Sequence, residues 1–139
     1  ELEMVHQFWE KPGLTADQKI RANLLPNVAW NGDVVMLTPE FLQQPHAGPY
    51  GNFVIGNVLQ DPFLQIVGRG KNTPYVLDFL RGLDGCQASC EYYTFCKGGY
   101  AANRFFEHGH LAGTETTFCR NCRKHLLDAC VSTLAQSSG

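Results

Sequence analysis

The chain has 139 residues, enough for one domain with its own hydrophobic core, and 44% of them are hydrophobic while 17% are charged. This composition excludes a disordered chain. The net charge of -2 without a basic run argues against nucleic-acid binding, and no apolar stretch approaches the roughly 18 residues that a membrane-spanning helix requires.

The N-terminal residues predict helical structure. Residues 1–13 carry apolar side chains at helical spacing and end in Pro12-Gly13, which stops a helix. Residues 14–25 fit either a helix that begins with a capping box at Thr15 or a short extended segment.

A β-hairpin is predicted next, at residues 27–37. Two Val-rich runs flank Asn31-Gly32, a strong hairpin signal because both residues tolerate positive φ. Residues 38–52 contain many Pro and Gly and read as a loop, and residues 53–59 predict a possible third strand.

The rest of the chain is predicted to be mostly helical. Pro follows a capping side chain at two places, which predicts short helices near residues 62–67 and 74–82. Residues 101–113 read as a loop with buried aromatic side chains. Residues 114–136 form the most helical segment, capped by Thr114 or Thr116 with Glu115 near the positive end of its dipole. The chain is therefore expected to be a small α+β domain.

Three cysteines lie within eleven residues at the spacing C-x3-C-x5-C, between two glycine-marked turns. This compact spacing favours one shared metal centre, and Gly85, Gly98 and Gly99 would let backbone donors approach the sulfurs. The fourth ligand is expected from the first turn of the last helix, where the helix N-terminus favours a thiolate. The candidates are Cys119 and Cys122.

The spacing does not choose between iron and zinc. Four thiolates suit a [4Fe-4S] cluster, and Cys86-x3-Cys90 ahead of Cys119-x2-Cys122 is also close to the two-knuckle spacing of structural zinc. Cys122 and Cys130 are predicted to be small buried apolar residues. Six cysteines are too few for a disulfide scaffold, so a reducing compartment, the cytoplasm, is favoured over a secreted, disulfide-bonded domain.

Several stretches, taken in order, resemble the C-terminal region of radical SAM/SPASM peptide maturases of the cyclophane-forming kind. Together they span roughly residues 27–125 and read NGDVVMLTPEF, YGNFVIGNVLQD, CQASCEYYTFCKGG, ANRFFEHG and TETTFCR. The resemblance implies a SPASM-like domain over residues 27–139, with residues 1–26 as a linker or the end of a preceding radical SAM domain. It further implies one auxiliary [4Fe-4S] cluster with the ligands Cys86, Cys90, Cys96 and Cys119.

Two departures from the family pattern limit what the chain can do. Leu37 and Tyr100 stand where two-cluster SPASM domains have cysteines, so one cluster is expected. C-x3-C-x2-C, which binds the S-adenosylmethionine-cleaving cluster, is absent from the sequence, so the chain alone is not expected to be catalytic.

The resemblance implies that the chain works as part of a peptide-modifying oxidoreductase. Its partners would be a precursor peptide and a radical SAM domain, in the same or a separate chain, which would bind S-adenosylmethionine. The cluster would take up an electron and help to position the substrate. The alternative is a non-catalytic binding module stabilised by zinc on four cysteines.

Aromatic, histidine and glutamate side chains near the cysteines are further candidates for a role at the site. Five aromatic side chains are predicted to form an apolar shell around the metal centre: Tyr92, Tyr93, Phe95, Phe105 and Phe106. His108 and His110 are read as solvated loop residues rather than ligands. Glu107 is a candidate substrate or cap residue, and for Glu115 the cap is favoured.

Overall fold

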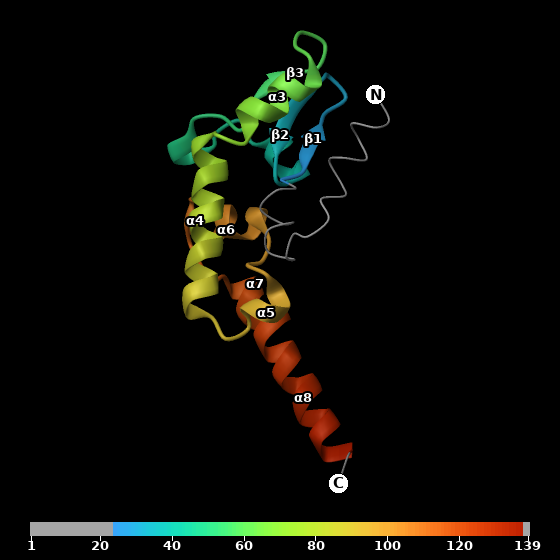
Figure 1. The fold of residues 1–139 in the computed structure, drawn as a ribbon, viewed down its shortest axis with the longest axis vertical. Helices are drawn as coiled ribbons and strands as arrows, with labels where there is room; N and C mark the ends of the chain where they lie inside the picture. Colours follow the sequence, from blue (N-terminus) through green and yellow to red (C-terminus); the bar gives the residue numbers. More distant parts are fainter. Residues whose placement is uncertain (1–23, 138–139) are drawn as a thin grey trace, which may run out of the picture. The chain divides into compact units, whose positions relative to one another are not determined.

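The structure is a computed structural model that describes residues 24–137 (Figure 1). The described chain folds as two compact units. The first contains residues 24–45 and 53–73, and the second contains residues 46–52 and 74–137. The predictions for residues 1–23 lie outside the described part, so the domain boundary at residue 26 stays a prediction.

The first unit is built on a small antiparallel sheet of order β1-β2-β3. β1 (Pro26–Val28) pairs with β2 (Asp33–Met36), so that Asn27 faces Val35, and β3 (Gly56–Asn57) pairs with the other edge of β2. The predicted hairpin is confirmed. The predicted third strand is also present, although it contains only two residues.

Asn31 and Gly32 adopt different backbone conformations in the hairpin turn. Gly32 has a positive φ of 90°, and its N–H donates to the Ala29 carbonyl at 2.9 Å. Asn31 stays at negative φ, and its side-chain amide donates to Asp33 Oδ2 at 2.8 Å. The Asn-Gly signal therefore predicts the hairpin correctly, but only one of its residues adopts the left-handed conformation.

The segment predicted as a loop at residues 38–52 contains two short 3₁₀ helices. These are η1 (Pro39–Gln43) and η2 (Gly48–Tyr50), and each has Pro near its start, where the missing N–H costs nothing. The loop prediction is therefore wrong for these turns.

The core of the first unit lies between the sheet and α3 (Phe63–Gly70), which packs against β2 and β3 (Figure 1). Phe41 and Phe53 stack with their rings parallel and their centroids 3.9 Å apart. Pro62 is the N-cap residue of α3 rather than its first helical residue, and the Asp61 carboxylate pairs with Arg69 at 2.5 Å instead of capping the helix.

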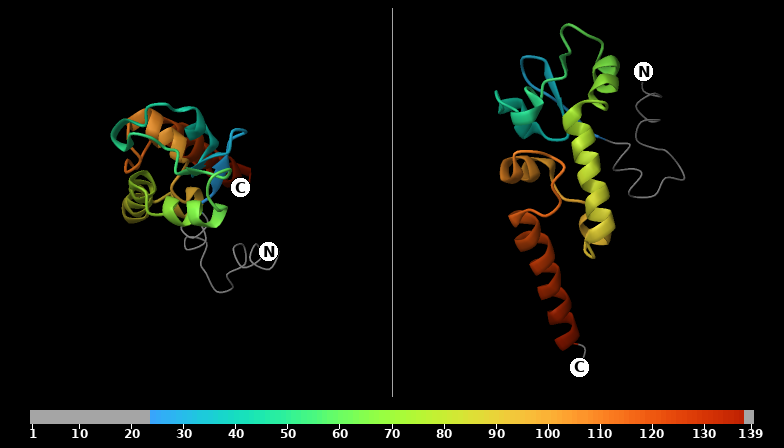
Figure 2. Two further views of the ribbon diagram at one scale, coloured as in Figure 1. Left: turned by 90° about the horizontal axis from the view of Figure 1, so that it is seen from above. Right: turned by 90° about the vertical axis from the view of Figure 1, so that its left-hand side faces the viewer.

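The second unit is helical (Figure 2). Besides η2, its elements are α4 (Pro74–Ser89), α5 (Tyr93–Cys96), α6 (Ala101–His108), α7 (Thr117–Cys119), the π-helical turn η3 (Arg120–Lys124) and α8 (His125–Ser137). Two predictions are corrected here. α4 continues past residue 82 through Gly85, where a turn is predicted, and the predicted loop at 101–113 contains α6.

Tyr50 ties the short piece 46–52 into the helical unit. Its hydroxyl donates to Asp78 Oδ2 at 2.7 Å and accepts from the Leu111 backbone N–H at 2.8 Å. Its ring lies edge-on to Tyr75, with centroids 6.2 Å apart. These contacts hold α4 and the segment after α6 together through one side chain.

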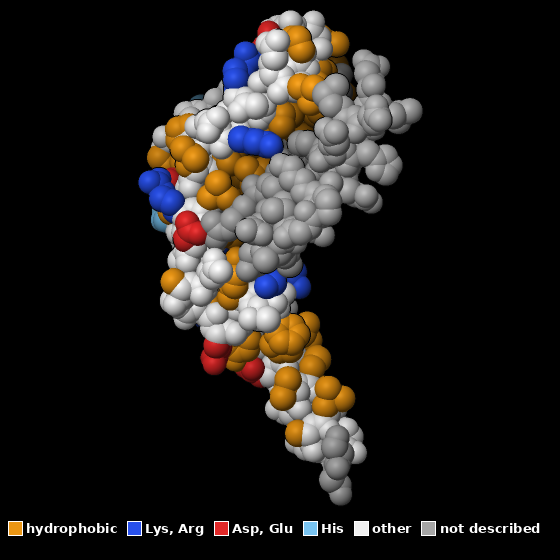
Figure 3. Space-filling model, in the orientation of Figure 1, with side chains coloured by type: hydrophobic (Ala, Val, Ile, Leu, Met, Phe, Trp, Pro, Cys, Tyr) orange, Lys and Arg blue, Asp and Glu red, His pale blue; other side chains and the backbone are white. Residues whose placement is uncertain are grey.

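The long final helix predicted from the sequence is present as the continuous run α7, η3 and α8. Figure 2 shows α8 extending past the ends of α4 and α6, and Figure 3 shows apolar side chains along it. None of the residues of α8 is buried. Between residues 24 and 137, no helix combines the length and apolar character needed to cross a membrane. The protein is thus a mixed α/β chain with a small antiparallel sheet and a long C-terminal helix.

Candidate metal centre

The three clustered cysteines are placed by the end of α4 and by α5. Cys86 lies in the last turn of α4, and its carbonyl accepts from the N–H of Cys90, just beyond the helix, at 2.9 Å. Cys96 is the last residue of α5. The break between the two helices turns the chain so that all three side chains can face one space.

Cys119 is placed by a helix cap. It is the last residue of α7, and its N–H donates to Oγ1 of Thr116 at 3.0 Å. Thr116 is thus the cap residue, as one of the two predicted alternatives has it. The acidic group at this helix start is Glu107 and not Glu115, because Glu107 accepts from the N–H groups of Thr117 and Phe118 at 2.5 and 3.3 Å.

The four predicted ligands, Cys86, Cys90, Cys96 and Cys119, line one cavity of about 120 Å³ in the helical unit. Cys119 is separated from the other three by more than twenty residues of sequence, so only the fold brings them together. Other side chains on its wall include Tyr93, Arg104, Thr114 and Lys124. Within the described residues, no three His, Cys, Asp or Glu side chains form a group that could hold a single metal ion.

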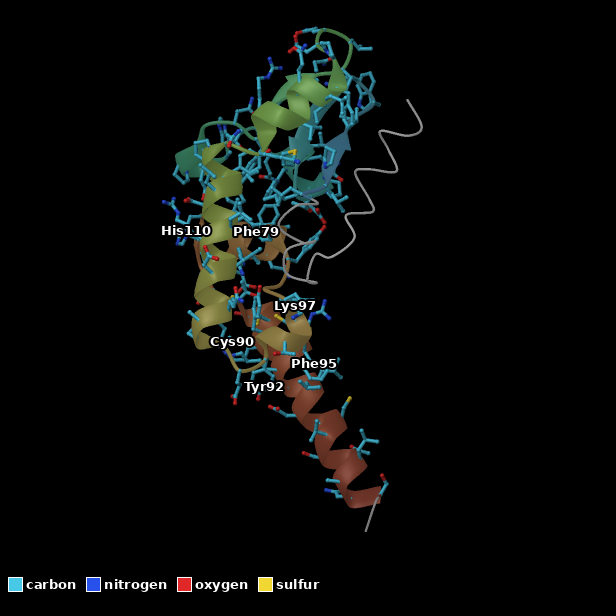
Figure 4. The ribbon with its side chains drawn as sticks, in the orientation of Figure 1. Phe79, Cys90, Tyr92, Phe95, Lys97 and His110 are labelled. Carbon is cyan, nitrogen blue, oxygen red and sulfur yellow. The ribbon has the colours of Figure 1, made fainter. Side chains whose placement is uncertain are left out.

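Cys122 and Cys130 lie elsewhere. Both are exposed, which corrects the prediction that they are buried, and with Leu126 they line a second cavity of about 220 Å³. Tyr92 and Phe95 form part of the opposite wall near the start of α8 (Figure 4). The sequence periodicity places Cys119 on the same helix face as Cys122, but the π-helical turn η3 begins directly after Cys119 and changes that angular spacing.

The loop after Cys96 has a backbone suited to an anionic group. Lys97, Gly98 and Gly99 have positive φ values of 55°, 101° and 73°, and the Gly98 N–H donates to Cys96 Sγ at 3.3 Å. A left-handed residue that directly follows a helical one, as Lys97 follows Cys96, forms an N–H-lined concavity of the kind that binds anions and iron-sulfur clusters. Gly98 and Gly99 line the cavity as predicted, whereas Gly85 does not and instead lies close to the Thr114 methyl group.

Arg104 is the residue at this site that the sequence reasoning missed. It lies on α6 with 1% of its surface exposed, and its Nη2 donates to Cys86 Sγ at 3.2 Å. The available signal was its place in the stretch AANRFFEHG, where one Arg shares a helix face with Ala101 and Phe105. A single charged side chain on an otherwise apolar helix face indicates that its charged group has a partner inside the fold.

The cysteine side chains affect one another electrostatically. Burial raises the pKa of the Cys86 thiol; the Arg104 charge opposes this shift, while the other three cavity cysteines add to it. Burial also raises the pKa of Cys119, to which Cys96 contributes. As a thiol, Cys86 also contacts the Thr114 carbonyl, with 3.7 Å between sulfur and oxygen. The Cys86 and Cys119 thiols therefore both feel the charges of neighbouring cysteines in the cavity.

The predicted aromatic shell is only partly present. Tyr93 is buried and lines the cysteine cavity, whereas Phe95 is exposed in the second cavity. Phe105 is buried beside Tyr50, with ring centroids 6.4 Å apart, and Phe106 is exposed. Of the five predicted rings, Tyr93 alone lines the cysteine cavity.

His108 and Glu115 are hydrogen-bonded to groups other than the cysteine sulfurs. His108 and His110 are exposed, and a His108 ring nitrogen hydrogen-bonds to the Glu115 carbonyl at 2.8 Å. The Glu115 carboxylate accepts from Arg120 Nε at 2.9 Å and from Lys124. The prediction that Glu115 belongs to the helix cap is therefore wrong, because its carboxylate is held by cations of the following turn.

Comparison with known proteins gives one similar sequence. No protein family matches the chain, and no solved structure matches it. Over 90 residues, or 65% of the chain, it is 34% identical to the uncharacterized protein sll1766 of Synechocystis. The matched region covers 23% of that protein, so the chain spans about a quarter of the length of this relative.

Proposed function

We propose that this chain is the auxiliary iron-sulfur domain of a radical SAM enzyme that modifies ribosomally made peptides. Cys86, Cys90, Cys96 and Cys119 would bind one [4Fe-4S] cluster, and the domain would have the SPASM-like architecture that the sequence resembles. One observation carries the proposal: four cysteines from two distant segments line the same cavity of about 120 Å³.

The cavity suits a cluster better than a single ion. Zinc requires four sulfurs at about 2.3 Å from one point. In a cubane cluster each thiolate binds a different iron, so the sulfurs are spread around a larger group. Here the four cysteines line a space of about 120 Å³, and within the described residues no three of them form a group that could hold a single ion.

Further support comes from the groups next to the sulfurs. The Gly98 N–H reaches Cys96 Sγ, and the Arg104 guanidinium reaches Cys86 Sγ. Hydrogen bonds of this kind tune the potential of a bound cluster. Tyr93 on the cavity wall would help to keep water from the sulfurs.

When bound, the cluster would supply a one-electron acceptor for the reaction of a neighbouring peptide. The residues of this chain would hold and shield it, and would contact the precursor peptide. Because C-x3-C-x2-C is absent from the sequence, S-adenosylmethionine would bind to a radical SAM domain in the same or a separate chain. In the Synechocystis relative, the matched region is likewise part of a much longer protein. We place the complex in the cytoplasm, where thiols stay reduced.

Metal analysis of the anaerobically purified chain tests the proposal. We expect brown protein with about four iron and four sulfide per chain. Cys96→Ser and Cys119→Ser should lose most of the iron, because each removes one ligand. The matched controls Cys122→Ser and Cys130→Ser lie outside the cavity and should retain it.

Two outcomes would contradict the assignment. Colourless protein with about one zinc and no sulfide would support the zinc-stabilised binding module instead. Iron that survives Cys119→Ser but not Cys122→Ser would move the fourth ligand by one helical turn.

A further inference from the structure

Arg104 is a buried cation that pairs with no acidic residue in the described part of the chain. Its side chain is among the largest that are fully buried, with 1% exposure. Among residues 24–137, no aspartate or glutamate forms an ion pair with it. Arginine is almost never fully buried unless an anion accompanies it, because desolvating its charge is costly.

The groups around the guanidinium identify the missing anion. Nη1 donates to the Leu111 carbonyl at 3.4 Å, and Nη2 donates to the Gly98 carbonyl and to Cys86 Sγ, the latter at 3.2 Å. The face of the guanidinium lies 5.3 Å from the centre of the Phe79 ring. Of these partners only the Cys86 sulfur can carry a full negative charge.

The surrounding chain is shaped for this side chain. A β-carbon at Gly82 would overlap Nη1 of Arg104 and would come within 2.8 Å of the Leu111 carbonyl. Gly98 supplies a carbonyl for the same guanidinium from a left-handed backbone. Two helices and a loop thus leave room for one cation directed at one sulfur.

Resting on the proposed function, we propose that Arg104 is the built-in counter-charge of the cluster and acts through the Cys86 sulfur. A cluster with four thiolates is anionic and becomes more so on reduction, so a fixed cation stabilises the reduced form more than the oxidised one. The hydrogen bond to the sulfur acts in the same direction. Arg104 would therefore keep the reduction potential higher and make the domain a better electron acceptor.

Lys124 provides an internal comparison. It also lines the cavity, but its side chain is 24% exposed and donates to Glu115 instead of to a cysteine sulfur, so solvent screens its charge. Lys124→Gln should therefore shift the potential much less than Arg104→Gln, although both remove one positive charge from the same wall.

The test is a redox titration of the anaerobic full chain, followed by the electron paramagnetic resonance of the reduced cluster. We expect Arg104→Gln to shift the midpoint potential to a more negative value. Arg104→Lys, which keeps the charge but loses the fork of donors, should lie between Arg104→Gln and the unaltered protein. A cluster-bearing Arg104→Gln protein with unaltered potential would overturn the proposal, as would a larger shift from Lys124→Gln.

A second measurement needs no substitution and covers variants that fail to fold. In the unaltered chain labelled with ¹⁵N-arginine, pulsed resonance spectra of the reduced cluster should contain a coupling to a guanidinium nitrogen. A reduced cluster without that coupling would contradict the role of Arg104 and leave the iron-sulfur assignment intact. A chain with no iron-sulfur signal at all would instead contradict the proposed function.

Discussion

Gly82 has no side chain, and the Arg104 guanidinium occupies the space that a side chain would need. It lies in the middle of α4, where glycine is unfavourable for a helix, yet a β-carbon here would overlap the Arg104 guanidinium. We expect Gly82→Ala to destabilise the protein by about 1–3 kcal/mol, the usual cost of overpacking a filled core. Urea unfolding monitored by circular dichroism measures this change.

Gly68 in α3 is the matched control, because it is also a helical glycine but has no atom within 4 Å of an added β-carbon. Gly68→Ala should stabilise the protein by about 0.5–1 kcal/mol through the lower entropy of the unfolded chain. Equal effects of the two substitutions would mean that helix propensity, and not contact with Arg104, governs position 82.

At the scale of elements, Glu107 joins α6 to the start of α7. Its carboxylate accepts from the first N–H groups of α7, and the hydrogen bond from Thr117 is the largest cause that holds its pKa below the ordinary 4.5. A carboxyl group whose pKa is lower in the folded than in the unfolded state stabilises the fold at pH values above its unfolded-state pKa. This contribution is lost as the pH falls through the folded-state pKa. The link between α6 and α7 is therefore expected to weaken in acid.

Glu107→Gln should remove that pH dependence. We expect the variant to be less stable than the unaltered chain near neutral pH and to approach it in acid, below the folded-state pKa, where Glu107 is protonated in both the folded and the unfolded state. Urea midpoints near neutral pH and in acid measure the difference. Glu91→Gln, at another exposed glutamate, should not reproduce this pattern; if it does, the effect reflects general surface charge.

Elements with strong local signals are predicted well. The hairpin follows from Asn31-Gly32, and the final helix follows from its length and the Thr116 cap. α6 is missed because its N-cap Tyr100 has no capping side chain and because its buried face includes an arginine, which breaks the apolar period. Tertiary packing around Arg104, and not local propensity, makes this segment a helix.

The sequence predicts only part of the candidate site. The spacing identifies Cys86, Cys90 and Cys96 as one group, but it leaves Cys119 and Cys122 equivalent. The structure separates these two because the π-helical turn η3 begins directly after Cys119 and contains Cys122. Such a turn has no reliable sequence signature, so periodicity alone places both on one face.

For the whole molecule, the six cysteines should differ in reactivity. In the metal-free folded protein, Cys122 and Cys130 are exposed, whereas Cys86 is buried and burial raises its thiol pKa. We expect iodoacetamide to modify Cys86 more slowly than Cys130, because the Cys86 sulfur is buried and its raised pKa leaves less of the reactive thiolate. Mass spectrometry of peptides over time gives the six rates.

Unfolding supplies the control for this experiment. In concentrated urea the six rates should converge, because the differences come from the fold and not from the neighbouring sequence. Equal rates for Cys86 and Cys130 in the folded protein would mean that the cavity opens freely to solvent.

The two units are interleaved along the chain. Residues 46–52 belong to the helical unit although the first unit both precedes and follows them, and their Tyr50 hydroxyl holds Asp78 and the Leu111 N–H. No single cut in the polypeptide releases both units whole. A fragment that starts at residue 74 would contain every cysteine but would lack Tyr50. In that fragment the Asp78 carboxylate and the Leu111 N–H would lose their shared hydrogen-bond partner and would bond to water instead.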